Sequence, residues 1–302
     1  MQVYFNDRFI PVGAAAELPL DAKYFVSKEQ VRISPDDRGF TFGDGVYEVL
    51  RSYSGRLFEF DHHMLRLQNS LVGIRIAGWN TLSFRPIVER LLLDNDLLTE
   101  DAKIYIQVTR GDAPRDHAFP PNGTPLTIFT TTSTIPTAAD SLPEAAPAVL
   151  TEDYRWTRCD IKQIGLLPGV LANQRAHEVG AFEALFVRDG KITEGTHTNF
   201  CAIIDGTLHT HPANNLVLPG ITRAVVLDIC RELGIPVVEE ALVAAELMQK
   251  IGDKKAAVEA MVLGTITEIK PIGRIEDQLI GDGRPGPLTG KIFAAFRKKT
   301  QS

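Results

Sequence analysis

The sequence predicts an α+β fold with mixed α/β elements, divided into two domains. Its length of 302 residues is enough for two domains of ordinary size. Strand and helix patterns occur in both halves, but without the regular βαβ alternation of a doubly wound sheet. A stretch rich in proline and small residues, with Pro136, Pro143 and Pro147, separates the halves. We therefore expect a small N-terminal α/β domain over residues 1–136, a linker over 137–147 and a larger C-terminal domain over 148–302.

Turn chemistry and periodicity predict the elements of the first half. Asn6-Asp7-Arg8 separates apolar runs at 3–5 and 9–12, which indicates a β-hairpin. Ser54-Gly55 indicates a second hairpin, between strands at 45–53 and 56–60. Asp61 is expected to cap a helix whose apolar residues recur near helical spacing. The other elements expected here are a helix over 83–94, with Pro86 in its first turn, and strands over 103–109 and 125–132.

The second half follows the same rules. Asp189-Gly190 and Asp205-Gly206 each predict a hairpin. A long helix is expected after Gly220, ending before Gly234 as a glycine at the C′ position would end it. The remaining elements expected are a strand leading from 148 towards 154, a helix over 171–179, a strand over 235–238, a helix over 244–250, a strand over 257–263 and a helix over 288–298.

Composition excludes several classes of protein. The net charge of -6, with no basic cluster longer than Arg297-Lys298-Lys299, argues against binding to nucleic acid. No apolar run approaches the roughly 18 residues of a membrane span, and the N-terminus lacks the pattern of a secretory signal. Three cysteines without metal-ligand spacing fit a reducing cytoplasm. The histidines at His62-His63 and at His209 and His211 lack ligand partners at suitable spacing, so we expect no metal.

One motif is set aside because its context is wrong. The segment Gly281-Asp282-Gly283-Arg284-Pro285-Gly286 has the spelling of a dinucleotide-binding fingerprint. Pro285 interrupts it, and no βαβ unit surrounds it to point its amides at a pyrophosphate. A turn before the last helix is the better interpretation.

Two other segments have the residue types of a binding site. The segment from Arg38 to Val49 has three glycines in seven residues, so its backbone must turn sharply or approach another group closely, and it places Tyr47 at the start of a strand. A plain glycine loop before a hairpin is the alternative. Arg115 and His117 lie two residues apart on a loop shaped by Pro114. An arginine fork binds a carboxylate through two hydrogen bonds and the histidine adds another donor, although a solvated loop is the alternative.

A lysine, a carboxylate and a helix start are the parts that pyridoxal 5'-phosphate (PLP) needs. Lys162 closes the segment 158–162, and an amine with its charge suppressed forms an imine with a carbonyl, although most lysines are solvated surface groups. Glu194 follows in Thr193-Glu194-Gly195. Gly220-Ile221-Thr222 begins a helix whose free amides bind phosphate. Arg66 lies on an otherwise apolar helix face and adds a cation, with a surface ion pair as the alternative.

These segments, in this order, resemble the fold-type IV PLP-dependent transaminases, and within that family the D-amino-acid aminotransferases. The resemblance runs from about Val31 to the C-terminus. No single motif would suffice, but together they are specific. The segments that resemble the family are 38–49, 109–111 with 114–117, 156–162, 193–195, 210–215 and 220–223.

The resemblance implies roles for individual residues. Lys162 resembles the lysine that holds PLP as a Schiff base, the internal aldimine, and later shuttles the proton. Glu194 resembles the acid that keeps the pyridine nitrogen protonated. The other cofactor-binding residues implied, all but Arg66 in the C-terminal domain, are Arg66, Ile221, Thr222 and Thr265 around the phosphate, Leu218 on the ring face, and Arg155 nearby. Tyr47, Arg115 and His117 resemble the trap for the substrate carboxylate, and the family implies a homodimer in which the arginine and histidine reach over from the second subunit.

The implied reaction moves the amino group of a D-amino acid such as D-alanine to a 2-oxo acid such as 2-oxoglutarate, giving pyruvate and D-glutamate. Branched-chain L-amino-acid transaminases and aminodeoxychorismate lyases share the lysine and glutamate but resemble this chain less at Arg115 and His117. An inactive PLP-binding relative is the alternative outside enzymes. Two features depart from the family. Residues Pro11 to Gln30 form a longer stretch, an elongated hairpin or an altered edge, and His197 replaces a small hydroxyl residue, so His197 joins the cofactor-binding candidates.

Overall fold

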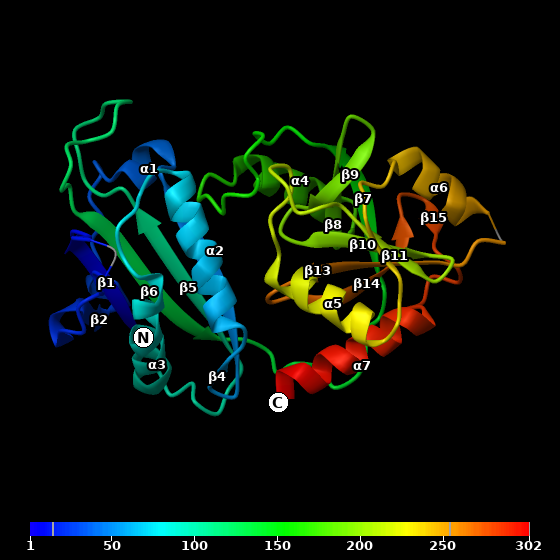
Figure 1. The fold of residues 1–302 in the computed structure, drawn as a ribbon, viewed down its shortest axis with the longest axis horizontal. Helices are drawn as coiled ribbons and strands as arrows, with labels where there is room; N and C mark the ends of the chain where they lie inside the picture. Colours follow the sequence, from blue (N-terminus) through cyan, green and yellow to red (C-terminus); the bar gives the residue numbers. More distant parts are fainter. Residues whose placement is uncertain (14, 254, 302) are drawn as a thin grey trace. The chain divides into compact units, whose positions relative to one another are not determined.

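The computed structural model describes residues 1–13, 15–253 and 255–301, and their contacts divide the chain into two compact units (Figure 1). The first unit is Met1–Ala138 with Ile161–Gly165, and the second is Ala139–Asp160 with Leu166–Ser302. Both contain helices and sheets, and the α+β class is confirmed. The domain boundaries predicted from composition stay a prediction. The contacts add one feature that composition did not indicate, because the short segment Ile161–Gly165 belongs to the first unit.

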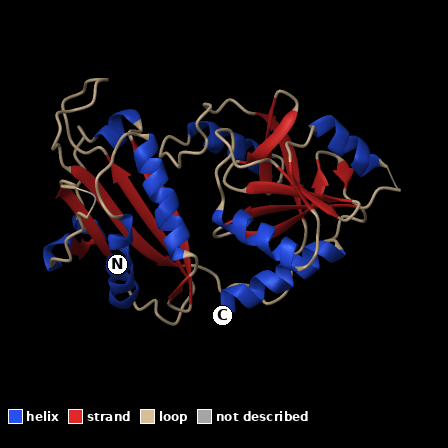
Figure 2. Cartoon of the chain, in the orientation of Figure 1, coloured by secondary structure: helices blue, strands red, loops and turns tan. Residues whose placement is uncertain are grey.

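The first unit is built on a six-stranded sheet in which each strand is antiparallel to its neighbours. In spatial order the strands are β2 (Phe25–Ser27), β1 (Gln2–Phe9), β6 (Leu126–Thr134), β5 (Ala102–Thr109), β3 (Gly45–Tyr53) and β4 (Arg56–Leu57). The helical elements are η1 (Ala22–Tyr24), η2 (Lys28–Gln30), α1 (Arg38–Phe42), α2 (Phe60–Gly73), η3 (Thr81–Ser83) and α3 (Phe84–Asp94). Helices α2 and α3 cover one face of this sheet (Figure 2).

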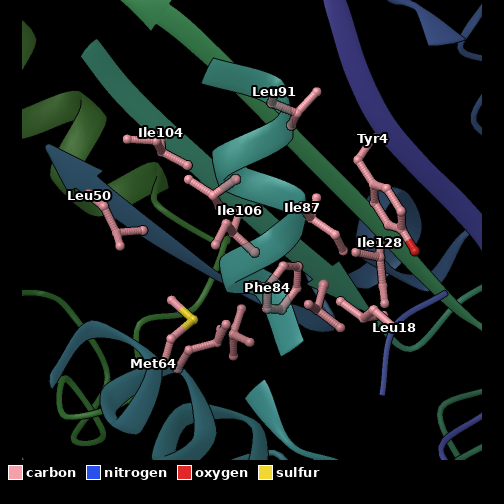
Figure 3. Packing of buried hydrophobic residues seen from close by; sticks show 14 of the residues in the cluster. Tyr4, Leu18, Leu50, Met64, Phe84, Ile87, Leu91, Ile104, Ile106 and Ile128 are labelled. Atoms are coloured by element: carbon pink, nitrogen blue, oxygen red, sulfur yellow. The ribbon is translucent and has the colours of Figure 1, made fainter. Parts of the chain in front are cut away.

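The core of the first unit lies between these helices and the sheet (Figure 3). Residues of β5 alternate between buried and partly buried positions, and Ile104 and Ile106 are on the helix-covered face. Phe84 and Ile87 of α3 are fully buried against them, and each such side chain contributes about 1.5–3 kcal/mol by leaving water. Residues with the opposite parity, such as Tyr105, therefore lie on the other face, the one that α2 and α3 leave uncovered.

The predicted hairpin at Asn6-Asp7-Arg8 is wrong. Residues 2–9 form one strand, β1, whose register with β6 shifts between Asn6 and Phe9. The Asn6 side chain is buried, where its amide donates to the Tyr4 hydroxyl and its oxygen accepts from the Arg8 amide. Those bonds stabilise a bulge rather than a reversal of the chain. The long stretch Pro11 to Gln30 contains β2, which pairs with β1 as the outermost strand. Of the two expectations for this stretch, an altered sheet edge is therefore the one observed.

Most other elements of the first unit are confirmed. The hairpin at Ser54-Gly55 joins β3 and β4, and the helix predicted over 83–94 is α3. The predicted cap is wrong, because α2 begins at Phe60 and its N-cap is Glu59. Asp61 lies inside the first turn, where a carboxylate still interacts favourably with the helix dipole.

The second unit is built on a nine-stranded mixed sheet. In spatial order its main path is β12 (Val237–Glu239), β11 (Thr207–Thr210), β10 (Asn199–Ile204), β13 (Val258–Gly264), β14 (Glu268–Ile275), β7 (Ala146–Glu152), β8 (Glu183–Arg188) and β9 (Lys191–Gly195), with β15 (Gln278–Leu279) paired to β14. Its helices are α4 (Leu167–Glu178), α5 (Ile221–Glu232), α6 (Ala244–Gly252) and α7 (Pro287–Gln301). Helices α5 and α7 pack together against β13, while α4 packs on β7 and β8 (Figure 1).

The predicted hairpins at Asp189-Gly190 and Asp205-Gly206 are confirmed as β8–β9 and β10–β11. The sequence patterns did not predict β14, because Pro271 inside it is typical of an edge or a non-strand segment. In the described residues no helix is both long and apolar enough to cross a membrane.

Candidate active site

Lys162 is held on the first unit by the strand that carries Tyr47. The Tyr47 amide donates to the Lys162 carbonyl over 2.9 Å, and the Lys162 amide donates to Ser70 Oγ of α2 over 3.1 Å. The segment therefore lies along the start of β3 although it comes far later in the sequence. Lys162 Nζ is 4.4 Å from the centroid of the Tyr47 ring. The structure thus brings together two of the predicted site residues, the lysine and the tyrosine.

Tyr47 belongs to an aromatic pair on the face of the sheet that α2 and α3 leave uncovered. Its ring stacks on Tyr105 of β5 at 5.7 Å, and the Tyr105 hydroxyl bonds to Gln107 Oε1 over 2.7 Å. Burial raises the pKa of Tyr105 to about 12, so this hydroxyl keeps its proton. A cavity of about 690 Å³ in the same unit is lined by Tyr105, Phe129 and Ile164 among others. None of the predicted site residues lines that cavity.

Arg66 is part of a buried network between α2 and β3. Its Nε and one terminal nitrogen donate to the two oxygens of Glu48, over 3.0 and 2.6 Å. His63 Nδ1 lies 3.0 Å from Glu48 Oε1, and all three side chains are buried. Sequence patterns missed Glu48 and His63. The signal was present as a carboxylate at an inward-facing position of a strand, where charged residues are rare unless they are paired.

The charges in this network are settled by its geometry. Burial alone would favour the neutral acid, but the Arg66 guanidinium and the His63 ring hold the pKa of Glu48 well below its usual range. Burial lowers the pKa of His63, so the ring is neutral near pH 7 and donates its Nδ1 hydrogen to the carboxylate. One ionised glutamate therefore fixes the arginine through a two-point, charge-assisted contact.

Glu194 has its own set of partners in the second unit, at the end of β9. One of its oxygens accepts from Asn199 Nδ2 over 3.0 Å and from the Leu218 amide over 3.1 Å. The other pairs with Arg155, which also bonds to both oxygens of Asp153. Burial opposes ionisation of Asp153, but hydrogen bonds from Arg155 hold the pKa of that carboxyl below its usual value. The structure therefore brings Arg155 and Leu218 to Glu194.

Asn199 connects this carboxylate to the start of α5, and sequence patterns missed it. Its amide also donates to the Leu218 carbonyl over 3.0 Å. A Cβ at Gly220, the N-cap of α5, would lie only 1.8 Å from Asn199 Oδ1, so this close approach requires glycine. The helix begins at Ile221 without a side-chain cap. Its first amides have no acceptor inside the helix and suit an anion.

The other predicted cofactor-binding residues lie near these elements of the second unit. Thr222 is in the first turn of α5, and Thr265 lies in the turn after β13. His197 has partners on the turn after β9. Its Nδ1 lies 3.0 Å from Thr196 Oγ1 and 3.2 Å from the buried carboxylate of Glu183, because the chain turns after β9 and sends adjacent residues in different directions.

Arg115 and His117 lie together on the loop between β5 and β6 of the first unit. Both side chains are exposed, and both contact the ring of Phe42 in α1. An arginine and a histidine two residues apart on one exposed loop have the chemistry to bind a carboxylate. Phe42 is a further residue that sequence patterns missed.

Known proteins with similar sequences and folds are aminotransferases. A family model described as amino-transferase class IV matches residues 45–275. The D-alanine aminotransferase of Staphylococcus epidermidis is 38% identical over 279 residues, which are 92% of this chain and 96% of that protein. The D-alanine aminotransferase of Bacillus licheniformis is 37% identical over 280 residues, 92% of this chain and 95% of that protein. The fold is similar to that of the Escherichia coli branched-chain amino acid aminotransferase, at a TM-score of 0.83 and 24% identity, covering 98% of this chain and 93% of that one.

Proposed function

Since the chain belongs to the class IV amino-transferases, we propose that it transfers the amino group of a D-amino acid, such as D-alanine, to a 2-oxo acid. With 2-oxoglutarate as acceptor the products are pyruvate and D-glutamate. The observation that carries the proposal is the identity of 37–38% with D-alanine aminotransferases over 92% of the chain. A coupled assay for pyruvate formed from D-alanine and 2-oxoglutarate tests it. A rate with L-leucine above that with D-alanine would contradict it.

The residues present fit PLP, the cofactor of this family. A buried carboxylate with hydrogen-bond donors around it, Glu194, suits a protonated ring nitrogen, and the uncapped start of α5 suits a phosphate. Lys162 supplies the amine. When bound, PLP provides an aldehyde carbon for that amine and a ring that accepts electrons from the substrate's α-carbon.

The roles of this chain's own residues follow. Lys162 Nζ would hold the cofactor covalently, and the same amine, when free, would take the proton from the substrate's α-carbon and return it. Glu194 keeps a negative charge opposite the ring nitrogen. The amides of Ile221 and Thr222 would hold the phosphate, with Arg66 and Thr265 as further phosphate-binding candidates. Leu218 would contact the ring, and Arg155 fixes Glu194. His197, whose Nδ1 lies beside the Glu183 carboxylate on the turn after Glu194, stays a cofactor-binding candidate.

The network behind Arg66 leads to a prediction. In Glu48→Gln the neutral amide can no longer compensate the buried guanidinium, and breaking such a pair costs about 3–5 kcal/mol. We expect a lower melting temperature and a PLP dissociation constant raised roughly tenfold or more, since Arg66 loses its fixed orientation. Titration of the apoenzyme with PLP, followed by absorbance, measures this.

The control is Asp61→Asn, which removes an exposed carboxylate of the same helix as Arg66, one that pairs with Arg85. Exposed pairs contribute little, so cofactor affinity should not change. An unchanged PLP dissociation constant in Glu48→Gln would show that the network has no part in cofactor binding.

Arg115, His117 and Tyr47 are proposed to hold the substrate carboxylate. Because Arg115 and His117 are exposed on the first unit, we propose a homodimer in which they complete the site of the second subunit. Arg115→Ala should raise the KM for D-alanine and for 2-oxoglutarate by roughly ten- to a hundredfold, since a charge-assisted fork is lost. Arg231→Ala, which removes an exposed arginine of α5, is the matched control. Unchanged KM values in Arg115→Ala would place the trap elsewhere.

Three alternatives are distinguished by substrate. A branched-chain L-amino-acid transaminase would prefer L-leucine to D-alanine, and an aminodeoxychorismate lyase would release pyruvate without an amino acceptor. An inactive relative would bind PLP without transferring an amino group. We place the enzyme in the cytoplasm, which is supported by three free, buried cysteines. Burial raises the pKa of Cys159 and of Cys201 to about 11, so these thiols stay protonated and unreactive.

A further inference from the structure

We propose that Phe42 is a positioning residue for substrate recognition, because its ring holds Arg115 and His117 in place as one two-donor trap. The inference rests on the proposed function, in which those two side chains bind the substrate carboxylate. It goes further by naming the residue that orients both exposed side chains before the substrate binds.

The Phe42 ring is the contact that the two side chains share. The Arg115 guanidinium carbon lies 5.1 Å from the ring centroid, and the His117 ring centroid lies 5.4 Å from it at an interplanar angle of 48°. An arginine over an aromatic face is attracted by the ring's quadrupole. An exposed arginine samples many rotamers and loses that freedom when it binds a carboxylate. An arginine that is already held in one orientation loses less conformational entropy on binding. Phe42 therefore orders both donors before the substrate arrives.

Arg38 fixes the other side of the arrangement. This buried side chain also lies over the Phe42 ring, at 4.8 Å, and its Nε donates to Asp44 Oδ2 over 2.9 Å. One terminal nitrogen donates over 2.6 Å to the carbonyl of Asp116, the residue between the two trap side chains. The backbone of the trap and the ring beneath it are thus attached to the same arginine.

Backbone contacts make α1 and the start of the loop one rigid piece. The Arg38 amide donates to the Gly111 carbonyl over 2.8 Å, and Asp37 and Asp112 form an antiparallel bridge. A Cβ at Gly39 would lie 2.3 Å from a methyl of Thr109, so the approach of α1 to the end of β5 needs glycine there. The trap is therefore positioned by the same segment that continues into β3 and Tyr47.

Three variants of the holoenzyme test the proposal. Phe42→Leu keeps much of the volume but removes the π face, while Phe42→Tyr keeps the face. Phe40→Leu makes the same change at the exposed phenylalanine of the same short helix and serves as the control. The measurements are KM and kcat for D-alanine and 2-oxoglutarate, and the dissociation constant of propionate, a carboxylate without an amine. Light scattering checks that each variant keeps the parent's mass.

For Phe42→Leu we expect KM and the propionate dissociation constant to rise roughly two- to fivefold with kcat changed less than about twofold, the range of a lost cation–π contact at an exposed site. Phe42→Tyr and Phe40→Leu should match the parent. If Arg115→Ala weakens propionate binding but Phe42→Leu does not, the inference is overturned and the proposed function stands. If neither variant changes propionate binding, the carboxylate trap lies elsewhere and the inference fails with it, while the pyruvate assay still decides the proposed function. A fall in kcat with unchanged KM and propionate binding would also overturn the inference.

Discussion

Lys162→Ala should abolish transamination and remove the visible absorbance that a lysine-bound PLP gives the protein. The substitution takes away the side chain that we propose as both the covalent attachment point and the base that moves the substrate's α-proton. General acid–base catalysis alone contributes about 10²–10⁴-fold, so with covalent catalysis also lost we expect kcat to fall by at least about 10⁴-fold. Steady-state kinetics and the absorption spectrum of the variant, reconstituted with PLP, measure both effects.

A matched control is available in the same unit. Lys23 also lies over a tyrosine ring, with Nζ 4.9 Å from the Tyr24 centroid, but it is largely exposed. Lys23→Ala should keep the parent's kinetics and spectrum. That result would show that the loss in Lys162→Ala does not come simply from removing a lysine that contacts a tyrosine ring. Normal turnover by Lys162→Ala would refute the assignment of the lysine.

Glu194→Gln should have the second largest effect. The amide has no charge to keep the ring nitrogen protonated, so the ring accepts electrons poorly, and we expect kcat to fall by roughly 10²–10³-fold. KM should change much less, because Glu194 does not belong to the proposed carboxylate trap. Single-turnover measurements with D-alanine isolate the affected step.

The stability of Glu194→Gln separates catalysis from folding. Arg155 loses one carboxylate but keeps two hydrogen bonds to Asp153, so the melting temperature should fall only moderately. Glu232→Gln breaks an exposed pair with Lys299 in the same unit and should leave kcat unchanged. If Glu194→Gln retained the parent's kcat, the acid would have no role in the reaction.

Local turn chemistry explains which parts of the fold were predictable. The three confirmed hairpins have a Ser-Gly or Asp-Gly pair, and both residues of each pair have positive φ, as the φ values of 50° at Asp189 and 76° at Gly190 illustrate. Asn6-Asp7-Arg8 has no glycine. Its apparent turn signal comes from an asparagine that is buried and satisfied within a bulged strand. The strand β14 was missed because it contains Pro271, and proline usually argues against a strand inside a sheet. In this protein the pairing of β14 with β13 outweighs that local preference.

The sequence predicts the chemistry of the candidate site but not the contacts of its residues. Lys162, Glu194 and Arg66 are predicted from residue type and order along the chain. Glu48 and His63 are 15 residues apart, and only the packing of α2 on β3 brings them together. Likewise, no local pattern indicates that Lys162 returns to the first unit and pairs with the backbone of Tyr47. Such contacts depend on tertiary structure, which periodicity does not encode.

The half-reaction with a single amino acid tests the central claim most directly. The PLP-loaded enzyme is mixed with D-alanine, L-alanine or L-leucine in the absence of any 2-oxo acid, and the cofactor absorbance and released oxo acid are followed through one turnover. We expect D-alanine to convert the cofactor to its amine form and to release one equivalent of pyruvate per site, with the L-amino acids slower by about two orders of magnitude or more. Conversion by L-leucine at a rate equal to or above that of D-alanine would contradict the account.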